Sequence, residues 1–274
     1  MTHSSGMNAA EQLLQMVNNC NTLMANSTDY AISHAILQSV REGEKISIQE
    51  LSDRASISPA AISRFIRRMG YSSFEDFKIH FNSSLMEIRL HRQLQHSHQY
   101  QDYSKGKIAD RIYQETLANL QATYKKMNLV SMEKAIRKMC EAESVTILGD
   151  DHTLSDFYTF QLDLLFWGIP AYLYKQRNVQ QLQTAQLSEK SVILFLNVCT
   201  DFISAQEWKM LKQAHEEKHA YMIGLFQESN ADVEEVFDDV LLYGIPHTTN
   251  DGFYSLTFLS RLFSEILTEI LSGR

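Results

Sequence analysis

Hydrophobic and polar positions follow two different patterns along the chain. Up to about residue 88, apolar side chains recur three and four residues apart, which predicts helices over about 7–25, 30–40, 47–55 and 59–69 and a further helix from Ser73. From residue 107 onward, short apolar runs alternate with helical stretches. This change of pattern predicts an all-α domain followed by an α/β domain.

The second region contains five apolar runs with the character of β-strands, at residues 144–148, 171–174, 191–196, 220–225 and 240–243. Strands that alternate with helices predict a mainly parallel five-stranded sheet flanked by helices. Any ligand should then bind beyond the carboxyl ends of the strands. The last predicted helix, at about 253–271, carries more apolar surface than an exposed helix needs, so we expect it to pack against the domain or to support a dimer.

The two regions are joined by the polar stretch RQLQHSHQYQDYSKG, which has no sustained apolar period and ends in a helix-breaking sequence at Gly106. We therefore expect domains at 1–88 and 107–274, with a linker at 89–106. Three histidines lie close together in this part of the chain, but they lack the helical spacing and the carboxylate of a typical metal site. No metal site is therefore predicted from His91, His96 and His98.

Composition and charge limit the class of protein. The chain has 274 residues, enough for about two domains, and 44% hydrophobic residues, which excludes a disordered tail protein. Its net charge is −8, but residues 41–92 hold nine Lys and Arg against seven Asp and Glu, whereas residues 107–274 hold fifteen against twenty-three. Nucleic acid attracts cationic surface, so the N-terminal region is the expected nucleic-acid side.

The pattern of apolar residues and cysteines also indicates a compartment. The longest uncharged apolar run, from Leu164 to Tyr174, is far shorter than the roughly 20 residues of a membrane-spanning helix. The polar start of the chain lacks a signal-peptide pattern. No CxxC pair occurs among Cys20, Cys140 and Cys199. We therefore expect a cytoplasmic protein with reduced thiols and no membrane partner.

The most specific signal lies between residues 47 and 70. Ser47 and Glu50 have the spacing of a capping box, which predicts the start of a short helix. After a tight turn, Ser58 and Pro59 mark a second helix start, because proline is tolerated at the first helical position. Gly70 then ends this helix. Two short helices joined by a tight turn are typical of a helix-turn-helix motif.

The second of these helices has two unlike faces. Its inward stripe consists of Ile62, Phe65, Ile66 and Met69. The other face has small residues near its start, three cations and no acid: Ala60, Ser63, Arg64, Arg67 and Arg68. Small side chains let a helix approach base edges, and arginine can bind phosphate or guanine. A solvated basic face would show the same pattern, but the helix-turn-helix context favours DNA binding.

The helix predicted after Ser73 bears four large apolar residues on one side, Phe74, Phe77, Phe81 and Leu85. We expect these side chains to form core beneath the motif. A stacking platform for single-stranded nucleic acid is the weaker interpretation.

The run IQELSDRASISPAAISRFIRRMGYSSFEDFK resembles the N-terminal domain of RpiR-type transcriptional regulators. The resemblance implies that the helix at 59–69 is the recognition helix. It implies DNA contact for Ser58, Ala60, Ser63, Arg64, Arg67 and Arg68. It further implies that Tyr71 and Lys78 touch the DNA backbone.

Residues 108–274 resemble, more weakly, the sugar isomerase (SIS) domain that these regulators carry. In SIS domains, backbone amides and a hydroxyl after the first strand, together with a loop after the third strand, hold a phosphate. The resemblance implies effector binding by Gly149, Thr153, Asn197, Cys199 and Thr200.

Both loops depart from the SIS pattern. Asp150 and Asp151 place two negative charges where a phosphate would arrive. After the third strand a glycine is lost, Asp201 adds an acid, and Phe202 stands where a hydroxyl residue is expected. We therefore expect a degenerate sensor, with an uncharged or cationic effector as an open possibility.

These observations predict a DNA-binding transcriptional regulator, and analogy with the family connects it with genes of carbohydrate metabolism and a carbohydrate-derived effector. One recognition helix buries too little surface for specific binding. We therefore expect a homodimer, or a dimer of dimers, on an inverted repeat in double-stranded DNA.

Two other functions stay open. The SIS-like domain could have lost its ligand and serve only as an assembly platform. A sugar-phosphate isomerase would need a base, for which His152, His247 and Glu265 are available, but none lies in a catalytic motif. Because no Walker loop, zinc signature or nucleophile elbow occurs, we predict neither an enzyme nor a cofactor.

Overall fold

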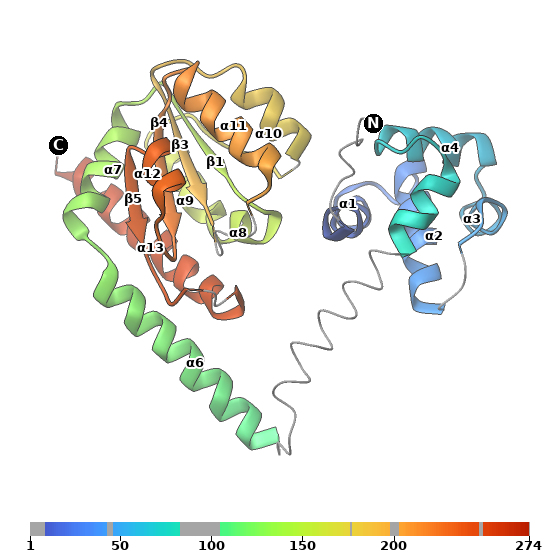
Figure 1. Ribbon diagram of the computed structural model, residues 1–274, viewed down its shortest axis with the longest axis horizontal. Helices are drawn as coiled ribbons and strands as arrows, with labels where there is room; N and C mark the ends of the chain where they lie inside the picture. The colour runs from blue at the N-terminus through green and yellow to red at the C-terminus, as the bar shows by residue number, and fades with distance from the viewer. Residues whose placement is uncertain are drawn as a thin grey trace. The chain divides into compact units, whose positions relative to one another are not determined.

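The computed structural model describes residues 9–42, 46–82, 105–175, 177–197, 203–246 and 249–273. The chain divides into two compact units, Met1–Asp102 and Tyr103–Arg274. Figure 1 shows helices in the first unit and a sheet between helices in the second. The expected combination of an all-α and an α/β domain is confirmed.

The first unit is built from α1 (Ala9–Thr22), α2 (Thr28–Glu42), α3 (Ile48–Ala55) and α4 (Pro59–Arg68), and residues 74–82 are helical as well. The apolar faces of these helices form one core, which includes Met16, Ile32, Ile36, Leu51, Ile62, Phe65, Ile66, Phe77 and Phe81. Phe77 and Phe81 are buried with ring centroids 5.3 Å apart, so they are core, as expected. Leu85 lies outside the described residues.

The second unit alternates helices and strands: α6 (Lys105–Lys126), α7 (Leu129–Glu141), β1 (Ser144–Leu148), α8 (Asp151–Asp156), α9 (Tyr158–Phe166), β2 (Ala171–Leu173), α10 (Arg177–Thr184), β3 (Ser191–Leu196), α11 (Ala205–Glu216), β4 (Tyr221–Phe226), α12 (Ala231–Val236), β5 (Asp239–Leu242) and α13 (Thr249–Ser272). Each predicted strand agrees with the observed strand to within one residue at either end. The alternation of apolar runs and helical stretches therefore predicted the secondary structure of this unit.

The five strands are all parallel, in the order β2-β1-β3-β4-β5. After β1 the chain continues to β2, which pairs with one edge of β1. From β2 it crosses to β3, which pairs with the other edge of β1. This reversal makes the gap between the carboxyl ends of β1 and β3 a topological switch point, where α/β sheets bind ligands. Gly149 and Asn197 follow directly after these two strands.

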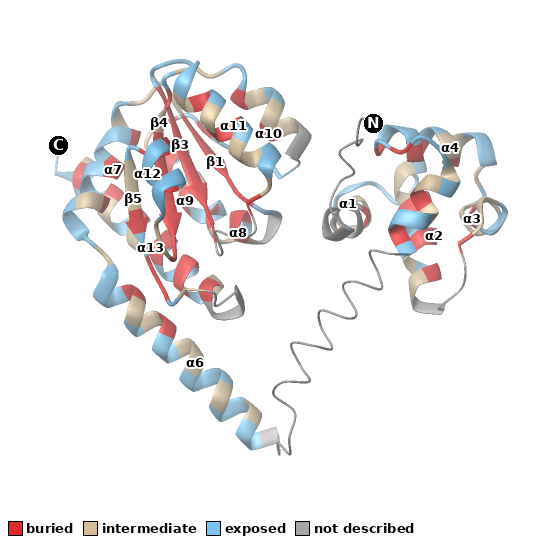
Figure 2. Ribbon diagram, viewed as in Figure 1, coloured by how far each residue is buried: buried red, intermediate tan, exposed pale blue. Residues whose placement is uncertain are grey.

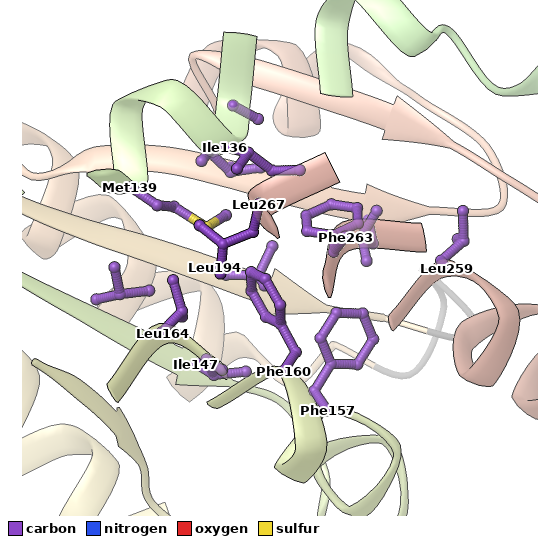
Figure 3. Packing of buried hydrophobic residues seen from close by; sticks show 14 of the residues in the cluster. Ile136, Met139, Ile147, Phe157, Phe160, Leu164, Leu194, Leu259, Phe263 and Leu267 are labelled. Atoms are coloured by element: carbon purple, nitrogen blue, oxygen red, sulfur yellow. The ribbon is translucent and has the colours of Figure 1, made fainter. Parts of the chain in front are cut away.

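Apolar cores lie on both faces of the sheet. Helices α7, α9 and α13 cover one face, where Phe157, Phe160 and Phe263 pack edge-on (Figure 3). Helices α11 and α12 cover the other face. Every residue of β3 is buried, and Figure 2 shows β1, β3 and β4 in red at the centre of the unit. Burial on both faces explains why these strands are nearly all apolar in sequence.

Helix α6 begins at Lys105, within the linker expected at 89–106, so the sequence Ser-Lys-Gly does not stop a helix here. Gly106 lies in the first helical turn, and the following residues favour a helix strongly enough to include it. The earlier part of the expected linker lies outside the described residues. Thr123 of α6 donates to Ser255 of α13 at 2.8 Å, and Ser255 donates to Asn119 of α6 at 2.8 Å. This buried polar cluster fixes α6 to the second unit.

The described ranges contain no helix that is both long and apolar enough to cross a membrane. They also contain no group of three His, Cys, Asp or Glu side chains that could hold a metal ion. The neighbouring histidines His91, His96 and His98 lie outside the described residues.

The core between the sheet and α13 can be tested by removing one buried side chain. Leu267 is fully buried on α13, so Leu267→Ala should lower the free energy of unfolding of the second unit by about 2–5 kcal/mol. Urea unfolding followed by tryptophan fluorescence measures this change, because both tryptophans, Trp167 and Trp208, belong to the second unit. The matched control Leu182→Ala, at a 63% exposed leucine, should cost less than about 1 kcal/mol. Equal losses would contradict this core.

Candidate DNA-binding helix and effector site

The connection between α3 and α4 is fixed by hydrogen bonds of its own serines. Ser56 ends α3 in the left-handed conformation, with φ 53°. The Ser52 hydroxyl donates to the carbonyl oxygen of Ile57 at 2.7 Å, and the Ser58 hydroxyl accepts from the Ala61 amide at 3.4 Å. The turn therefore has a defined path from α3 into α4, as a helix-turn-helix motif requires.

The expected capping box at the start of α3 is half formed. The Ser47 hydroxyl accepts from the Glu50 amide at 3.1 Å. The reciprocal bond, from the Ser47 amide to the Glu50 carboxylate, is not among the bonds of the described residues. One orphan amide at the helix start is thus satisfied by the serine alone.

Helix α4 is anchored by its inward stripe, because Ile62, Phe65 and Ile66 are buried in the core of the first unit. The structure brings the predicted contact residues together on and before the opposite side. Ser63 is half-buried there, and the others are exposed: Ser58, Ala60, Arg64, Arg67 and Arg68. The helix consequently offers small residues near its start and cations towards its end.

The three arginines differ in their partners. Arg68 forms an ion pair with Asp29 of α2, and its guanidinium lies 5.8 Å from the centroid of the Phe65 ring. For Arg64 and Arg67, no carboxylate of the described residues forms an ion pair. Their charges are therefore uncompensated on the outward face of α4, whereas Arg68 is tied to α2.

Tyr71 and Lys78 are placed differently from the residues on α4. Tyr71 is only 6% exposed, and its ring packs edge-on against Phe77 at 5.3 Å. Lys78 is half-buried, with its Nζ 3.6 Å from the carboxylate of Glu75. Beside them, hydrogen bonds from Ser72 lower the pKa of the Asp76 carboxyl. This end of the motif is a packed and internally paired surface.

Gly149 follows β1 at the switch point, in a space that admits no side chain. A Cβ atom here would lie 2.8 Å from the Thr153 hydroxyl oxygen and 2.9 Å from the carbonyl oxygen of Leu196. The second of these is backbone of the neighbouring strand β3, which cannot move away easily. Glycine is therefore required by the close approach of the two strand ends.

The loop after Gly149 satisfies its own polar groups. The Asp150 carboxylate accepts from the Thr153 amide at 2.9 Å, and the Thr153 hydroxyl donates to the Asp150 carbonyl oxygen at 3.0 Å. Thr153 is also fully buried. The amide and the hydroxyl that an anion would use in this turn are consequently occupied by Asp150.

Asn197, in contrast to Thr153, has a polar side-chain atom without a partner among the described residues. Its backbone amide donates to Leu225 at 3.1 Å, and its carbonyl oxygen accepts from the Tyr243 hydroxyl at 2.7 Å. Its side chain is only 9% exposed, yet its Oδ1 has no hydrogen-bond partner in the described part of the chain. A buried carbonyl without a partner costs free energy, which a hydrogen-bond donor on a ligand would recover.

Several predicted residues cannot be placed. Cys199 and Thr200, together with Asp201 and Phe202, lie outside the described residues, as do His247 and the side chains of Asp151 and His152. Of the three candidate bases for an isomerase, Glu265 alone has a side chain that the structure describes. It is an exposed residue of α13, 3.6 Å from the guanidinium of Arg261. A solvated ion pair of this kind is common on helix surfaces and does not mark a catalytic arrangement.

Two residues of the strand-end site were missed in the sequence. Gln180 of α10 donates to the carbonyl oxygens of both Gly149, at 3.0 Å, and Tyr174, at 2.7 Å. Tyr243, the residue directly after β5, donates its hydroxyl to the backbone carbonyl oxygen of Asn197. No local pattern marks either residue, because each acts on a partner brought close only by the tertiary fold.

Comparison with known proteins agrees with this division into two parts. Residues 7–87 match the family described as "Helix-turn-helix domain, rpiR family", so this region is a helix-turn-helix domain of that family. Over 240 residues, the chain is 20% identical to an HTH-type transcriptional regulator of Clostridium perfringens (strain 13 / Type A). The alignment covers 82% of each chain.

Solved structures show the fold of the whole chain and of its second unit. The Vibrio vulnificus NanR protein, solved in complex with ManNAc-6P, is 16% identical and has a TM-score of 0.53, covering 95% of this chain and 92% of that chain. Phosphoheptose isomerase from Neisseria gonorrhoeae is 12% identical with a TM-score of 0.50, covering 60% of this chain and 99% of that chain. At these identities the likeness shows the fold alone.

The structure and the comparisons define a class of protein in which a helix-turn-helix domain precedes an α/β domain with the SIS-type fold. Such a protein binds DNA through its first domain. The chain is a transcriptional regulator with a helix-turn-helix domain of the rpiR family.

The close approach at Gly149 gives a direct test of the strand-end geometry. Gly149→Ala places a methyl group against the backbone of Leu196, so it should lower the free energy of unfolding of the second unit by about 1–3 kcal/mol. The matched control is Gly106→Ala in α6, where nothing lies within 4 Å of the added Cβ, and it should cause no loss. Urea unfolding of both variants measures the difference. An unchanged Gly149→Ala variant would show that the strand ends lie farther apart.

Proposed function

We propose that α4 is the recognition helix and that Arg64 and Arg67 make its principal contacts with DNA. The supporting observation is that both arginines are exposed and uncompensated on one face of a helix whose other face is buried. An exposed guanidinium on a rigid helix can bind the O6 and N7 of guanine or a phosphate. The small side chains of Ser58, Ala60 and Ser63 let the start of α4 approach the bases closely.

The remaining predicted contacts have smaller roles in this proposal. Arg68 must share its charge with Asp29, so it contributes to a phosphate contact only in part. Lys78 shares its charge with Glu75 in the same way. Tyr71 supports the motif from within the core, because its buried ring has little surface to offer DNA.

The protein acts as a homodimer, or a dimer of dimers, on an inverted repeat in double-stranded DNA. A single small recognition helix buries too little surface for specific binding, and a two-fold pair of such helices doubles the contact. The place of action is the cytoplasm.

The second unit acts as the sensor, for a small molecule derived from carbohydrate. NanR supports the chemical class, because it shares the fold and was solved with ManNAc-6P. The strand-end loop supports a changed ligand, since Asp150 already takes the Thr153 amide and adds negative charge. Asn197 offers a buried acceptor instead. The effector is therefore an uncharged or cationic sugar derivative that donates a hydrogen bond to Asn197.

The sequence is also compatible with two other functions. An assembly-only domain is favoured by the same Asp150–Thr153 bonds, because they leave the turn satisfied without a ligand. An isomerase has no support from Glu265, which is solvated and paired with Arg261. We place the protein among regulators whose second domain binds rather than converts its ligand.

The recognition helix is tested by removing each uncompensated arginine. A duplex selected from a random library by the wild-type protein serves as the probe. Arg64→Ala and Arg67→Ala should each weaken binding about 5- to 150-fold, the range for losing a base contact. If an arginine contacts phosphate instead, the slope of affinity against salt should fall by about one.

The matched control for this experiment is Arg137→Ala on α7, an exposed arginine of the second unit that is paired with Glu133. Its affinity for the duplex should equal that of the wild type. Wild-type affinity in both Arg64→Ala and Arg67→Ala would refute the assignment of α4.

The sensor is tested by thermal unfolding with neutral sugars, amino sugars and ManNAc-6P. A neutral or amino sugar at 100 times its Kd should stabilise the protein by about 2.7 kcal/mol, and Asn197→Leu should abolish the shift. A shift with ManNAc-6P alone would contradict the changed ligand class. No shift with any compound would favour the assembly-only domain.

A further inference from the structure

Arg68 differs from the other two arginines of α4 because its charge is engaged within the protein. It lies one turn after Arg64, so it shares the outward face of the helix. Its guanidinium forms an ion pair with the Asp29 carboxylate of α2 and lies 5.8 Å from the centroid of the Phe65 ring. The side chains of Arg68 and Asp29 are still 57% and 37% exposed. The pair therefore belongs to the surface of the first unit, at the end of the basic face of α4.

Tertiary packing determines the position of Asp29. This residue lies in the first turn of α2, where the Ser27 hydroxyl accepts from the Tyr30 amide at 3.1 Å. Ile32 and Ile36 of the same helix are fully buried in the core that also anchors α4. The carboxylate is consequently held beside the last residue of α4, on a helix that the core keeps in place.

The main effect of this ion pair is on the charge of the basic face. An ion pair between solvent-exposed side chains contributes little to the free energy of unfolding, because water screens it. Arg64, Arg67 and Arg68 carry three positive charges, and Asp29 compensates one of them. The basic face thus has less available positive charge than its sequence indicates.

A DNA phosphate and the Asp29 carboxylate are alternative partners for the Arg68 guanidinium. Both are anions that accept hydrogen bonds from its N–H groups. A phosphate that approaches Arg68 must displace a carboxylate that packing already holds in place, or it stays beside that carboxylate and is repelled. Either event weakens binding. Arg64 and Arg67 have no such competitor among the carboxylates of the described residues.

We propose that Asp29 limits the affinity of this protein for DNA, because it holds Arg68 away from the phosphates and adds a negative charge beside them. The inference rests on the proposed function, in which α4 is the recognition helix, and it names a residue of α2 that sets the strength of binding. Phosphate contacts carry no sequence information, so Asp29 lowers binding to all duplexes alike. Contacts with the bases are left to discriminate between sequences.

A double-mutant cycle tests the inference with the full-length wild type, Asp29→Asn, Arg68→Ala and the double variant. Fluorescence anisotropy measures the Kd at salt concentrations from about 50 to 300 mM. The probes are the duplex selected from the random library and a scrambled duplex of the same length and composition.

The matched control is Asp53→Asn, alone and combined with Arg68→Ala. It removes the same charge from an exposed aspartate of α3, whose carboxylate accepts from Gln49 at 3.0 Å. Because Asp29 also interacts favourably with the N-terminus of α2, thermal unfolding by circular dichroism verifies that every variant is folded. Asp29→Ser is a second variant that removes the charge with a different side chain.

Asp29→Asn should raise the affinity for both duplexes about 3- to 10-fold at the lowest salt, and the slope of affinity against salt should increase by about one phosphate contact. The ratio of the two affinities should stay the same. Arg68→Ala should reduce affinity by a factor at least about three times larger in the Asp29→Asn background than in the wild type, because only the released arginine contacts DNA. With Asp53→Asn, the effect of Arg68→Ala should be the same as in the wild type.

Two results would overturn the inference. One is a folded Asp29→Asn or Asp29→Ser variant that binds no more tightly than the wild type, or gains affinity for one duplex only. The other is an equal effect of Arg68→Ala in the wild-type and Asp29→Asn backgrounds, which would reduce Asp29 to a general contribution to net charge.

The same measurements separate this inference from the proposed function. If Arg64→Ala and Arg67→Ala weaken binding but the cycle shows no coupling, the inference alone fails. If those two variants bind like the wild type while the cycle shows coupling, the assignment of Arg64 and Arg67 fails and the inference stands. A wild type that binds no duplex refutes both.

Discussion

Burial of β3 on both of its faces is the constraint on which the second unit depends. All six residues of this strand are buried, and its side chains alternate between the two apolar cores. Because β3 pairs with β1 and β4, its central position fixes the order of the sheet. That order places the carboxyl ends of β1 and β3 side by side, and it brings Gly149 against the backbone of Leu196. The candidate effector site is a consequence of how the core is packed.

In the first unit, burial of one side likewise fixes the orientation of a helix. Burial of one stripe of α4 determines that the other stripe points away from the core, so hydrophobic packing positions the cations. Pairing then distinguishes between them, because Arg68 is held by Asp29 while Arg64 and Arg67 keep their charge available. If α4 is the recognition helix, as proposed, its backbone is already held in place by the core before DNA binds. This preorganisation connects the core of the unit with its function.

The strand-end site and the outer side of α9 differ in chemical character. At the switch point, the Asp150 carboxylate accepts from the Thr153 amide in the turn after β1, whereas Asn197 has a buried Oδ1 with no hydrogen-bond partner among the described residues. On the outer side of α9, apolar surface is abundant and charge is absent.

The sequence by itself determined the secondary structure and the class of this protein. Amphipathic period, serine caps and alternating apolar runs act over a few residues, so the five strands, the helix-turn-helix and the basic face of α4 could all be predicted. Only the tertiary structure decided the burial of Tyr71, the pairing of Arg68 with Asp29 and the contact of Tyr243 with Asn197, because each depends on a partner distant in the chain. The exposure of apolar side chains on α9 could not be predicted either, because an apolar run in the sequence is the same whether the helix is buried on one side or on both sides. Local sequence patterns determine which secondary structure a segment forms, whereas tertiary packing determines which of its faces remain exposed for binding.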